Sequence, residues 1–275
     1  MGTPPRICSC CALTGLVLAP HIFPVSIVSA ASNEVRITAI VKEANLVTND
    51  AGRQAASIGD AVRIGNEIIT GIDSRAEVTF ENKAVARLGA NAALTVKSKN
   101  VIELSRGALL LDFPGNTKRK VQAGAISVVV GRATALLEYH PTVFKFLVLE
   151  GKARLYRPRH PGDSILVSAG RMVFGDARAA LTDPVDFDID RFVKTCPLIQ
   201  AFSPLSGDKL IAAEIQTQQR AKSKKTLIAT NLVIFSGGST VSIVDPNKRS
   251  SGVEGAANPT ATTTSGSRAA SETHP

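Results

Sequence analysis

Apolar residues recur at every second position, in short bursts, from about Val35 to Leu181, and this pattern constrains the fold more than any other feature. Each burst is bounded by Gly, Asn, Asp or Pro, which is typical of half-buried β-strands separated by turns. Val35, Ile37 and Ala39 form one such burst. The pattern predicts an all-β core, built as an elongated stack of short strands that is either solenoid-like or a sandwich.

The stretch from Phe80 to Val96 shows how neighbouring strands are joined. Glu81, Asn82 and Lys83 interrupt two apolar runs. Asn tolerates positive φ, so these three residues predict a tight turn that returns one strand beside the next. We therefore expect a hairpin or a corner here.

Glycines punctuate the strands at a nearly regular interval. By subtraction, the first three are 18 residues apart, the fourth follows 17 later, and the last three are separated by 20 and 19: Gly71, Gly89, Gly107, Gly124, Gly131, Gly151 and Gly170. Such a quasi-period indicates successive similar units, each turning at a glycine where a side chain would clash. The alternative is coincidence, because glycine is common in β-turns.

Composition narrows the possible functions. Of the 275 residues 44% are hydrophobic, but only 4% are aromatic and none is Trp. The core must therefore consist of aliphatic residues, and an aromatic platform for stacking bases or sugars is disfavoured. The net charge is +9, which attracts anionic head groups or acidic envelope polymers. The basic residues form only short groups, namely Lys118-Arg119-Lys120, then Arg154, Arg157 and Arg159, and then Lys222, Lys224 and Lys225. We expect no nucleic-acid partner.

Residues 1–30 resemble an export signal. Arg6 is their only charged side chain, and Val28-Ser29-Ala30 fits a cleavage site, so we expect cleavage after Ala30. Cleavage would leave a mature chain with a charge of +8 and no integral membrane span, located in the periplasm or secreted. The alternative is an uncleaved anchor, although Pro20, His21 and Pro24 interrupt the apolar run.

Cysteine usage follows from that cleavage. Cys8, Cys10 and Cys11 would leave with the signal, and nothing near them completes a metal site. Cys196 would then be the remaining cysteine. Free cysteine is among the most buried residue types, so we expect it in the interior.

A series of short motifs resembles the FecR domain over about Val35 to Val173. The motifs are Ser57–Val62 with its Gly-Asp step, Glu67–Gly71 (EIITG), Ser74–Phe80, Ala86–Gly89 (ARLG), Leu94–Val96, Leu104–Leu109, Val148–Ala153 (VLEGKA) and Ser168–Gly170. The segment Arg132–Leu137 is similar to a family segment written R-G-T-x-F-x-V, but Ala133 stands where the family has Gly. If that position needed positive φ, alanine would be strained there.

The resemblance implies an all-β module that acts in the periplasm or outside the cell. The best-known FecR proteins are anti-sigma regulators, with a cytoplasmic domain and a membrane span before this module, and they relay a signal from an outer-membrane siderophore transporter. In this sequence the module begins almost directly after the expected signal. We therefore expect an exported interaction module rather than such a regulator.

The expected organisation is a signal at 1–30, a FecR-like all-β domain at 31–182, an extension at 183–245 and a disordered tail at 246–275. Within the extension, Asp183–Asp190 is acidic and is predicted to be a linker. The segment Asp208–Lys222 predicts a helix with Asp208 as its N-cap and with Ile211 and Ile215 on one side. Thr226–Phe235 and Thr240–Val244 flank Ser-Gly-Gly-Ser, which predicts a hairpin.

Catalytic patterns are weak in this sequence. His140 and His160 each precede a proline, and a general base needs an orienting partner that the sequence does not identify. Asp188 and Asp190 could be paired carboxylates, but the linker interpretation is simpler. We expect no enzyme activity, and no catalytic, cofactor or metal residues. Three functions stay open: a non-catalytic module that binds an envelope protein or acidic polymer, a membrane-anchored signal relay, and a carbohydrate-binding or enzymatic protein.

Overall fold

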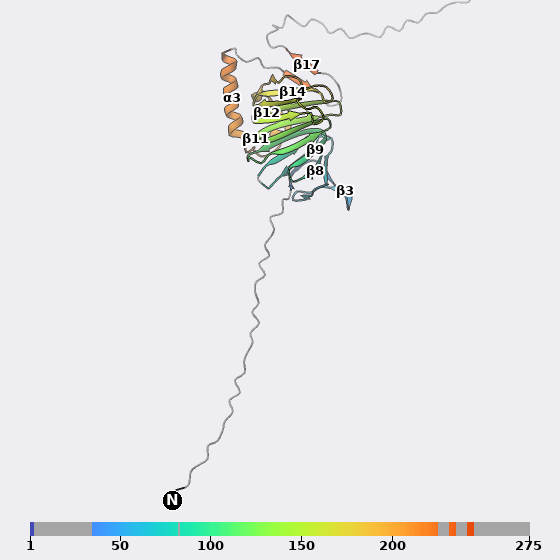
Figure 1. Cartoon of the computed structure of the whole chain (residues 1–275), viewed down its shortest axis with the longest axis vertical. Coiled ribbons are helices and arrows are strands. Elements are labelled where there is room, and N and C mark those ends of the chain that lie inside the picture. Colours follow the sequence, from blue (N-terminus) through green and yellow to red (C-terminus); the bar gives the residue numbers. More distant parts are fainter. Residues whose placement is uncertain (3–34, 82, 225–230, 235–240, 245–275) are drawn as a thin grey trace, which may run out of the picture. The chain divides into compact units, whose positions relative to one another are not determined.

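The computed structural model describes residues 1–2, 35–81, 83–224, 231–234 and 241–244. Fifteen strands are joined by hydrogen bonds into one mixed sheet, and three helices follow them along the chain (Figure 1). Two further strands, β16 (Asn231–Ile234) and β17 (Val241–Val244), pair with each other. The predictions of an all-β core, a C-terminal helix and a hairpin are therefore confirmed. The predicted signal and tail lie outside the described residues.

The large sheet folds into two layers because its three longest strands pass through both. Each of the three pairs with one set of neighbours along its first half and with another set along its second half. These strands are β9 (Val101–Phe113), β11 (Ile126–Tyr139) and β12 (Val143–Tyr156). For example, β9 pairs with β8 (Ala93–Ser98) in its first half and with β7 (Val85–Leu88) in its second.

We call the two layers A and B. In order of pairing, layer A contains β4, β1, β6, β7, the second half of β9, the second half of β11, the first half of β12, β14 and β15. Layer B contains β3, β2, β5, β8, the first half of β9, β10, the first half of β11, the second half of β12, and β13. The remaining bounds are β1 (Val35–Val41), β2 (Ala44–Thr48), β3 (Gly52–Ala55), β4 (Ala61–Val62), β5 (Glu67–Thr70), β6 (Arg75–Thr79), β10 (Arg119–Ala123), β13 (Ser164–Ser168), β14 (Arg171–Asp176) and β15 (Val185–Asp186).

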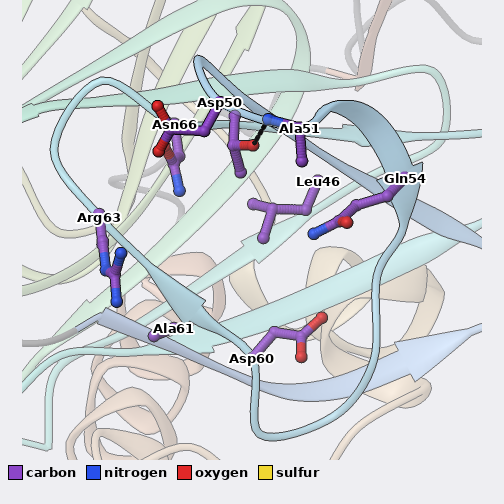
Figure 2. Close-up of a pocket in the computed structure, with 9 residues that line it drawn as sticks. Leu46, Asp50, Ala51, Gln54, Asp60, Ala61, Arg63 and Asn66 are labelled. Carbon is purple, nitrogen blue, oxygen red and sulfur yellow. Dashed lines mark hydrogen bonds between the residues drawn. The ribbon is translucent and has the colours of Figure 1, made fainter.

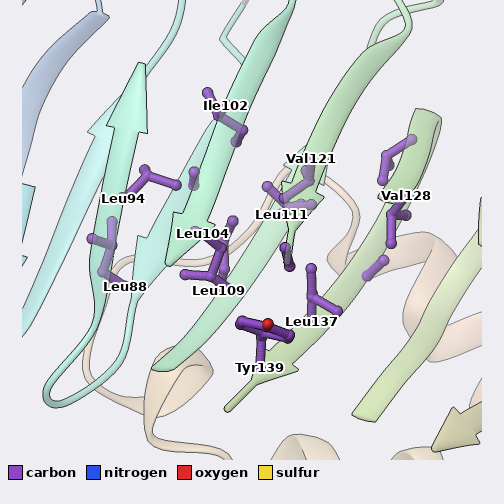
Figure 3. Packing of buried hydrophobic residues seen from close by; sticks show 14 of the residues in the cluster. Leu88, Leu94, Ile102, Leu104, Leu109, Leu111, Val121, Val128, Leu137 and Tyr139 are labelled. Carbon is purple, nitrogen blue, oxygen red and sulfur yellow. The ribbon is translucent and has the colours of Figure 1, made fainter. Parts of the chain in front are cut away.

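The main core lies between the two layers and is mostly aliphatic. Alternate residues of most strands point into it, because successive side chains of a strand face opposite sides. Leu94 and Leu104 from layer B gather there with Leu109 and Leu137 from layer A (Figure 3). These inward positions explain the period of two in the sequence.

The glycine spacing also has a structural explanation. The chain alternates between a hairpin in one layer and a hairpin in the other, and each hairpin begins and ends at the same edge of the sheet. The glycines mark the crossings between layers, with Gly71, Gly89 and Gly107 at one edge and Gly131, Gly151 and Gly170 at the other. Gly124 is the exception, because it lies in the turn between β10 and β11.

Two of these crossings admit no side chain. Gly107 has φ of +93°, and a Cβ atom there would lie 2.6 Å from the Cα of Ala92. Gly151 has φ of +77°, and its Cβ would lie 2.6 Å from the carbonyl oxygen of Arg132. Ala133 is paired with Gly151 and is not among the positive-φ residues, so the strain considered for Ala133 does not arise. The glycine of the partner strand makes room at this crossing.

The predicted turn after Phe80 joins β6 to β7 as a hairpin. The backbone N–H of Phe80 donates to the carbonyl of Ala84 at 2.8 Å, and Lys83 has φ of 60°. Asn82 lies outside the described residues. A positive φ in this turn is therefore observed at Lys83.

A second, smaller core lies on the outer face of layer A, where three helices cover the sheet. We call residues 187–223 the helical cap, which contains α1 (Ile189–Thr195), α2 (Pro197–Gln200) and α3 (Asp208–Ser223). Apolar residues of the cap, such as Ile189 and Leu198, pack against Leu110, Leu136 and Leu149 of the sheet. None of the helices in the described part of the chain is both long enough and apolar enough to span a membrane.

Two details of this region differ from the sequence predictions. The residue that caps α3 is Gly207, and Asp208 lies in the first turn. The predicted linker at residues 183–190 is instead packed, because its apolar residues alternate with the acidic ones. It contains β15, and Phe187 is buried.

Candidate functional site

Three polar side chains lie in a row under the helical cap. Thr134 of β11 is paired directly with Asp112 of β9 on one side and with Glu150 of β12 on the other. All three point away from the main core, and the residues beside them in each strand are mostly apolar. The cap buries them, leaving at most 5% of each residue exposed.

Hydrogen bonds link this row to the cap. The Thr134 hydroxyl lies 3.0 Å from Asp112 Oδ1 and 3.1 Å from Glu150 Oε1. The other oxygen of Asp112 accepts two hydrogen bonds from Ser206, one from its N–H and one from its hydroxyl, both at 2.7 Å. A hydroxyl has one proton, so Thr134 can donate to only one of its two carboxyl neighbours. The network is complete when Glu150 is protonated and donates to Thr134.

The electrostatics of Glu150 agree with this arrangement. Burial raises the pKa of the Glu150 carboxyl, and the negative charges of Asp112 and Glu214 raise it further. In the ionised form Glu150 could instead accept a hydrogen bond from Thr134, and this bond and the charge of Arg132 lower the pKa, but they do not outweigh burial. The neutral acid is therefore favoured relative to an exposed glutamate.

Gly207 brings the cap close enough to close this site. A Cβ atom at residue 207 would lie 2.5 Å from Thr134 Oγ1 and within 3.4 Å of both carboxyl groups. The absence of a side chain thus lets the start of α3 lie directly over the polar row. Little space is left between the row and the loop above it.

Arg87 of β7 contacts α2 and the part of the cap between α2 and α3. Its guanidinium donates to the carbonyl of Leu198 at 3.0 Å and to the carbonyl of Ser203 at 2.5 Å. Its Nε donates to Glu77 Oε2 at 2.8 Å, and the ring of Phe202 lies 5.0 Å from the guanidinium carbon. Because Arg87 is only 2% exposed, these contacts satisfy a buried charge and fix the cap on layer A.

The outer face of layer B has a different character. Lys120, Val129, Arg154 and Leu166 are directly paired across β10, β11, β12 and β13. Lys152 lies two residues before Arg154 and therefore on the same face. We call the outward surface of these four strands the basic face. Among the described residues no helix covers it, whereas layer A is covered.

A shallow hollow borders the basic face. It has a volume of about 490 Å³ and lies beside the turn that joins β12 to β13. Arg154, Tyr156 and His160 line it, together with the ion pair of Arg157 and Asp163 at 3.0 Å. The hollow is therefore adjacent to the positive side chain of Arg154.

Another pocket, of about 300 Å³, lies near the start of the sheet (Figure 2). Polar side chains line it, as a carbohydrate-binding or enzymatic protein would need. Several are engaged in local turns, since the Thr48 hydroxyl accepts from the Ala51 N–H at 3.1 Å and Asp60 accepts from the Ser57 N–H at 2.7 Å. None of its lining residues is aromatic.

The residues considered for catalysis each contact a nearby polar group. His140 is in the turn between β11 and β12, with Nε2 3.6 Å from Glu138, and His160 is bonded to Arg157 at 2.8 Å. Asp188 caps α1 by accepting from the Arg191 N–H. Asp190 is paired with Lys194 of the same helix. Cys196 is buried, as predicted.

The basic groups have mixed surroundings. Arg119, of the first basic group, is buried, with its guanidinium carbon 4.1 Å from the centre of the Phe80 ring. Burial lowers the pKa of Arg119, and the charge of Glu81 opposes this. Lys222 bonds Asp188 at 2.6 Å. Burial raises the pKa of Asp188, but the hydrogen bonds from Lys222 and the Arg191 N–H prevail and hold it below its ordinary value.

The polar row and the contacts of Arg87 with the cap are not among the sites that the sequence predicts. A usable signal was present, because Asp112 and Glu150 are charged residues inside apolar strand segments. Three motifs of the FecR resemblance also supply residues of this site: Arg87, Thr134 and Glu150. These motifs thus include contacts to the cap, which follows them in the chain.

Comparison with known proteins agrees with the motifs. The sequence model of the family described as "FecR protein" matches residues 66–154, about a third of the chain. No curated protein matches the sequence. Two crystal structures of a candidate anti-sigma factor from Parabacteroides distasonis, at 1.65 and 2.50 Å resolution, are similar with TM-scores of 0.39 and 0.38. Each is 10% identical, and the similarity covers 65% of this chain and 98% of theirs. From the motifs and the family match, the chain contains a FecR domain.

Proposed function

We propose that this protein is a non-catalytic FecR-domain module that binds another component of the cell envelope. One observation carries the proposal: within the part of the chain that the structure describes, a helical cap packs on the outer face of layer A, whereas no helix covers the basic face of layer B. A sheet face that offers charge together with Tyr156 and Leu166 is suited to a protein partner.

The buried polar groups support a non-catalytic role. Asp112 and Glu150 are the most enclosed carboxyl groups of the site, yet their oxygens are engaged with Thr134 and Ser206. Gly207 occupies the space above them. A reacting group would need room beside these carboxyls, so their arrangement serves to hold the cap.

A site-specific crosslinking experiment tests this function. A photoreactive amino acid replaces Leu166 on the basic face, and a matched variant carries it at Leu210 on α3. The two leucines are 51% and 43% exposed, so they sample solvent similarly. Illumination in the native host should give a discrete partner adduct from position 166 and little from position 210. Equal labelling at both positions, or no adduct at either, would refute the proposal.

Export to the periplasm or outside the cell is part of the same proposal. It rests on the signal-like residues 1–30, and the intact mass of the native protein tests it. A soluble species beginning near Ala31 is expected. A full-length protein in the cytoplasmic fraction would contradict export.

A second candidate is a membrane-anchored signal relay, and the family match favours it. The FecR domain resembles that of regulators which carry signals across an envelope, and the same binding face could then receive a signal. This function requires that residues 7–29 anchor the chain. Recovery of an uncleaved protein in the membrane fraction would support the relay over the exported module.

A further inference from the structure

The outer edge of β13 offers backbone groups for another strand. Among the described residues β13 pairs only with β12. The Arg157 N–H donates to the Asp163 carbonyl and the Ala169 N–H donates to the Gly151 carbonyl, both at 3.0 Å. These two bonds show which residues of β13 direct their backbone groups toward β12. Hydrogen-bonded pairs recur at every second residue of an antiparallel ladder, so Ile165 and Val167 face β12. The N–H and C=O groups of Leu166 and Ser168 therefore point toward the unpaired edge.

Positive charge lies beside that edge. Lys152, Arg154 and Lys120 project from the outward side of β12 and β10, and none of them forms an ion pair with a carboxylate of the described residues. The outward residues of β13 itself are Ser164, Leu166 and Ser168, which carry no charge. The basic half of the face thus begins one strand away from the unpaired edge.

We propose that the β13 edge and the basic face bind an extended, acidic segment of a partner protein, which adds to layer B as a further strand. This inference rests on the proposed interaction function and names the chemistry of the partner. A polypeptide strand supplies the backbone groups that Leu166 and Ser168 lack, and its acidic side chains supply charge for Lys152 and Arg154. An acidic polysaccharide or lipid surface would supply only the charge.

The distances suit such a partner. Neighbouring strands lie about 5 Å apart, so an added strand would run about 10 Å from β12. A Glu side chain reaching from the added strand and the Arg154 side chain reaching from β12 together span this gap. Arg154 already donates to Ser164 at 2.9 Å, which directs its guanidinium toward β13.

Fluorescence anisotropy with the full-length protein tests the charge requirement. The probe is a short labelled peptide that alternates Glu and Thr, compared with the same peptide carrying Lys in place of Glu. We expect binding of the acidic peptide alone, weakened by salt. The double variant Lys152→Gln and Arg154→Gln should bind about tenfold more weakly. The matched double variant Lys209→Gln and Arg191→Gln, which removes the same charge from the exposed side of the cap, should bind like wild type.

Two comparisons test strand addition. Leu166→Pro removes the edge N–H, whereas Leu166→Ala removes the side chain and keeps the N–H, so the proline variant should bind about fivefold more weakly than the alanine variant. Alternate N-methylation of the acidic peptide should abolish its binding to the wild-type protein, which gives a readout even if the proline variant fails to fold.

The outcomes separate this inference from the broader function. If N-methylation has no effect and polyglutamate and a sulfated polysaccharide bind equally well, the face binds polyanions in general and strand addition is wrong. If the Lys peptide binds as well as the Glu peptide, the charge argument is wrong. A partner crosslinked at Leu166 would in either case still support the interaction module, whereas loss of that crosslink would remove both.

Discussion

Ser206 donates two hydrogen bonds of 2.7 Å to one carboxylate oxygen of Asp112, although 94 residues separate the two in the sequence. This contact joins the residue before the N-cap of α3 to the C-terminal end of β9. The cap shields the Asp112 carboxylate from water. The two donors of Ser206 stabilise this carboxylate, because both point at the same oxygen. The stability of the cap should therefore depend strongly on Asp112.

Replacing Asp112 with alanine should lower the free energy of unfolding by about 3 kcal/mol, because the donors of Ser206 and the hydroxyl of Thr134 lose a buried acceptor. Urea unfolding measures the change. Asp50→Ala, at an exposed turn, is the control and should cost less than about 0.5 kcal/mol. A loss at Asp112 no larger than at Asp50 would show that the cap does not depend on this network.

The raised pKa of Glu150 predicts that the stability of the protein decreases as the pH rises. Its pKa is raised above the ordinary value of 4.5 in the folded protein, mainly by burial. Its contribution to stability is therefore fully present below that value and is lost as the pH rises through the folded pKa. Wild type should lose stability relative to Glu150→Gln as the pH rises above 4.5 and through the raised folded pKa.

Urea unfolding at several pH values measures this difference, and comparison with the Gln variant cancels other titrating groups such as Asp188 and Asp208. The exposed substitution Glu43→Gln should leave the pH profile unchanged. If wild type instead gained stability over Glu150→Gln as the pH rises, Glu150 would be held as a carboxylate and the proposed proton arrangement would be wrong.

Gly207→Ala should destabilise the protein by about 2 kcal/mol, since the new methyl group would meet Thr134 Oγ1 at 2.5 Å. Gly131→Ala is a matched control, because a Cβ there has no neighbour closer than 3.7 Å and its φ is not positive. Thermal unfolding compares the two variants. Equal melting temperatures would mean that the loop over the polar row can move away without cost.

Arg87→Lys should loosen the cap without removing the charge. A lysine cannot reach Glu77, the Leu198 carbonyl and the Ser203 carbonyl together, because it lacks the planar guanidinium. Limited proteolysis should then cut faster within residues 196–207. Arg106→Lys at an exposed position is the control, and equal cleavage rates for both variants would contradict a clamping role for Arg87.

The strands and their turns could be predicted from the sequence because they depend on local signals. Alternation along β1 and the polar turn after Phe80 are visible within a few residues, and the glycines mark the crossings. The spacing of 18 to 20 residues is the length of one hairpin that begins and ends at the same edge. The sequence pattern does not reveal that alternate hairpins lie in different layers, because this depends on pairing between distant segments.

The cap and the polar row could not be predicted in the same way. Arg87 bonds the carbonyl of Leu198, 111 residues later, and no local pattern connects these positions. The charges of residues 183–190 predict a linker, but the apolar Phe187 and Ile189 between them are buried and pack against the sheet. A charged residue within an apolar segment of a strand indicates such a site, as Asp112 does after Ala108–Leu111.

The continuity of β12 has a mechanical consequence. Glu150, under the cap, and Arg154, on the basic face, belong to one strand on opposite sides of the crossing at Gly151. Four residues of extended chain separate them, a length of about 13 Å. Gly151 cannot accept a side chain and is packed against Ala133. The backbone therefore has little room to move where β12 crosses between the layers. A force applied to Arg154 along β12 would therefore reach the underside of the cap without first unravelling either layer.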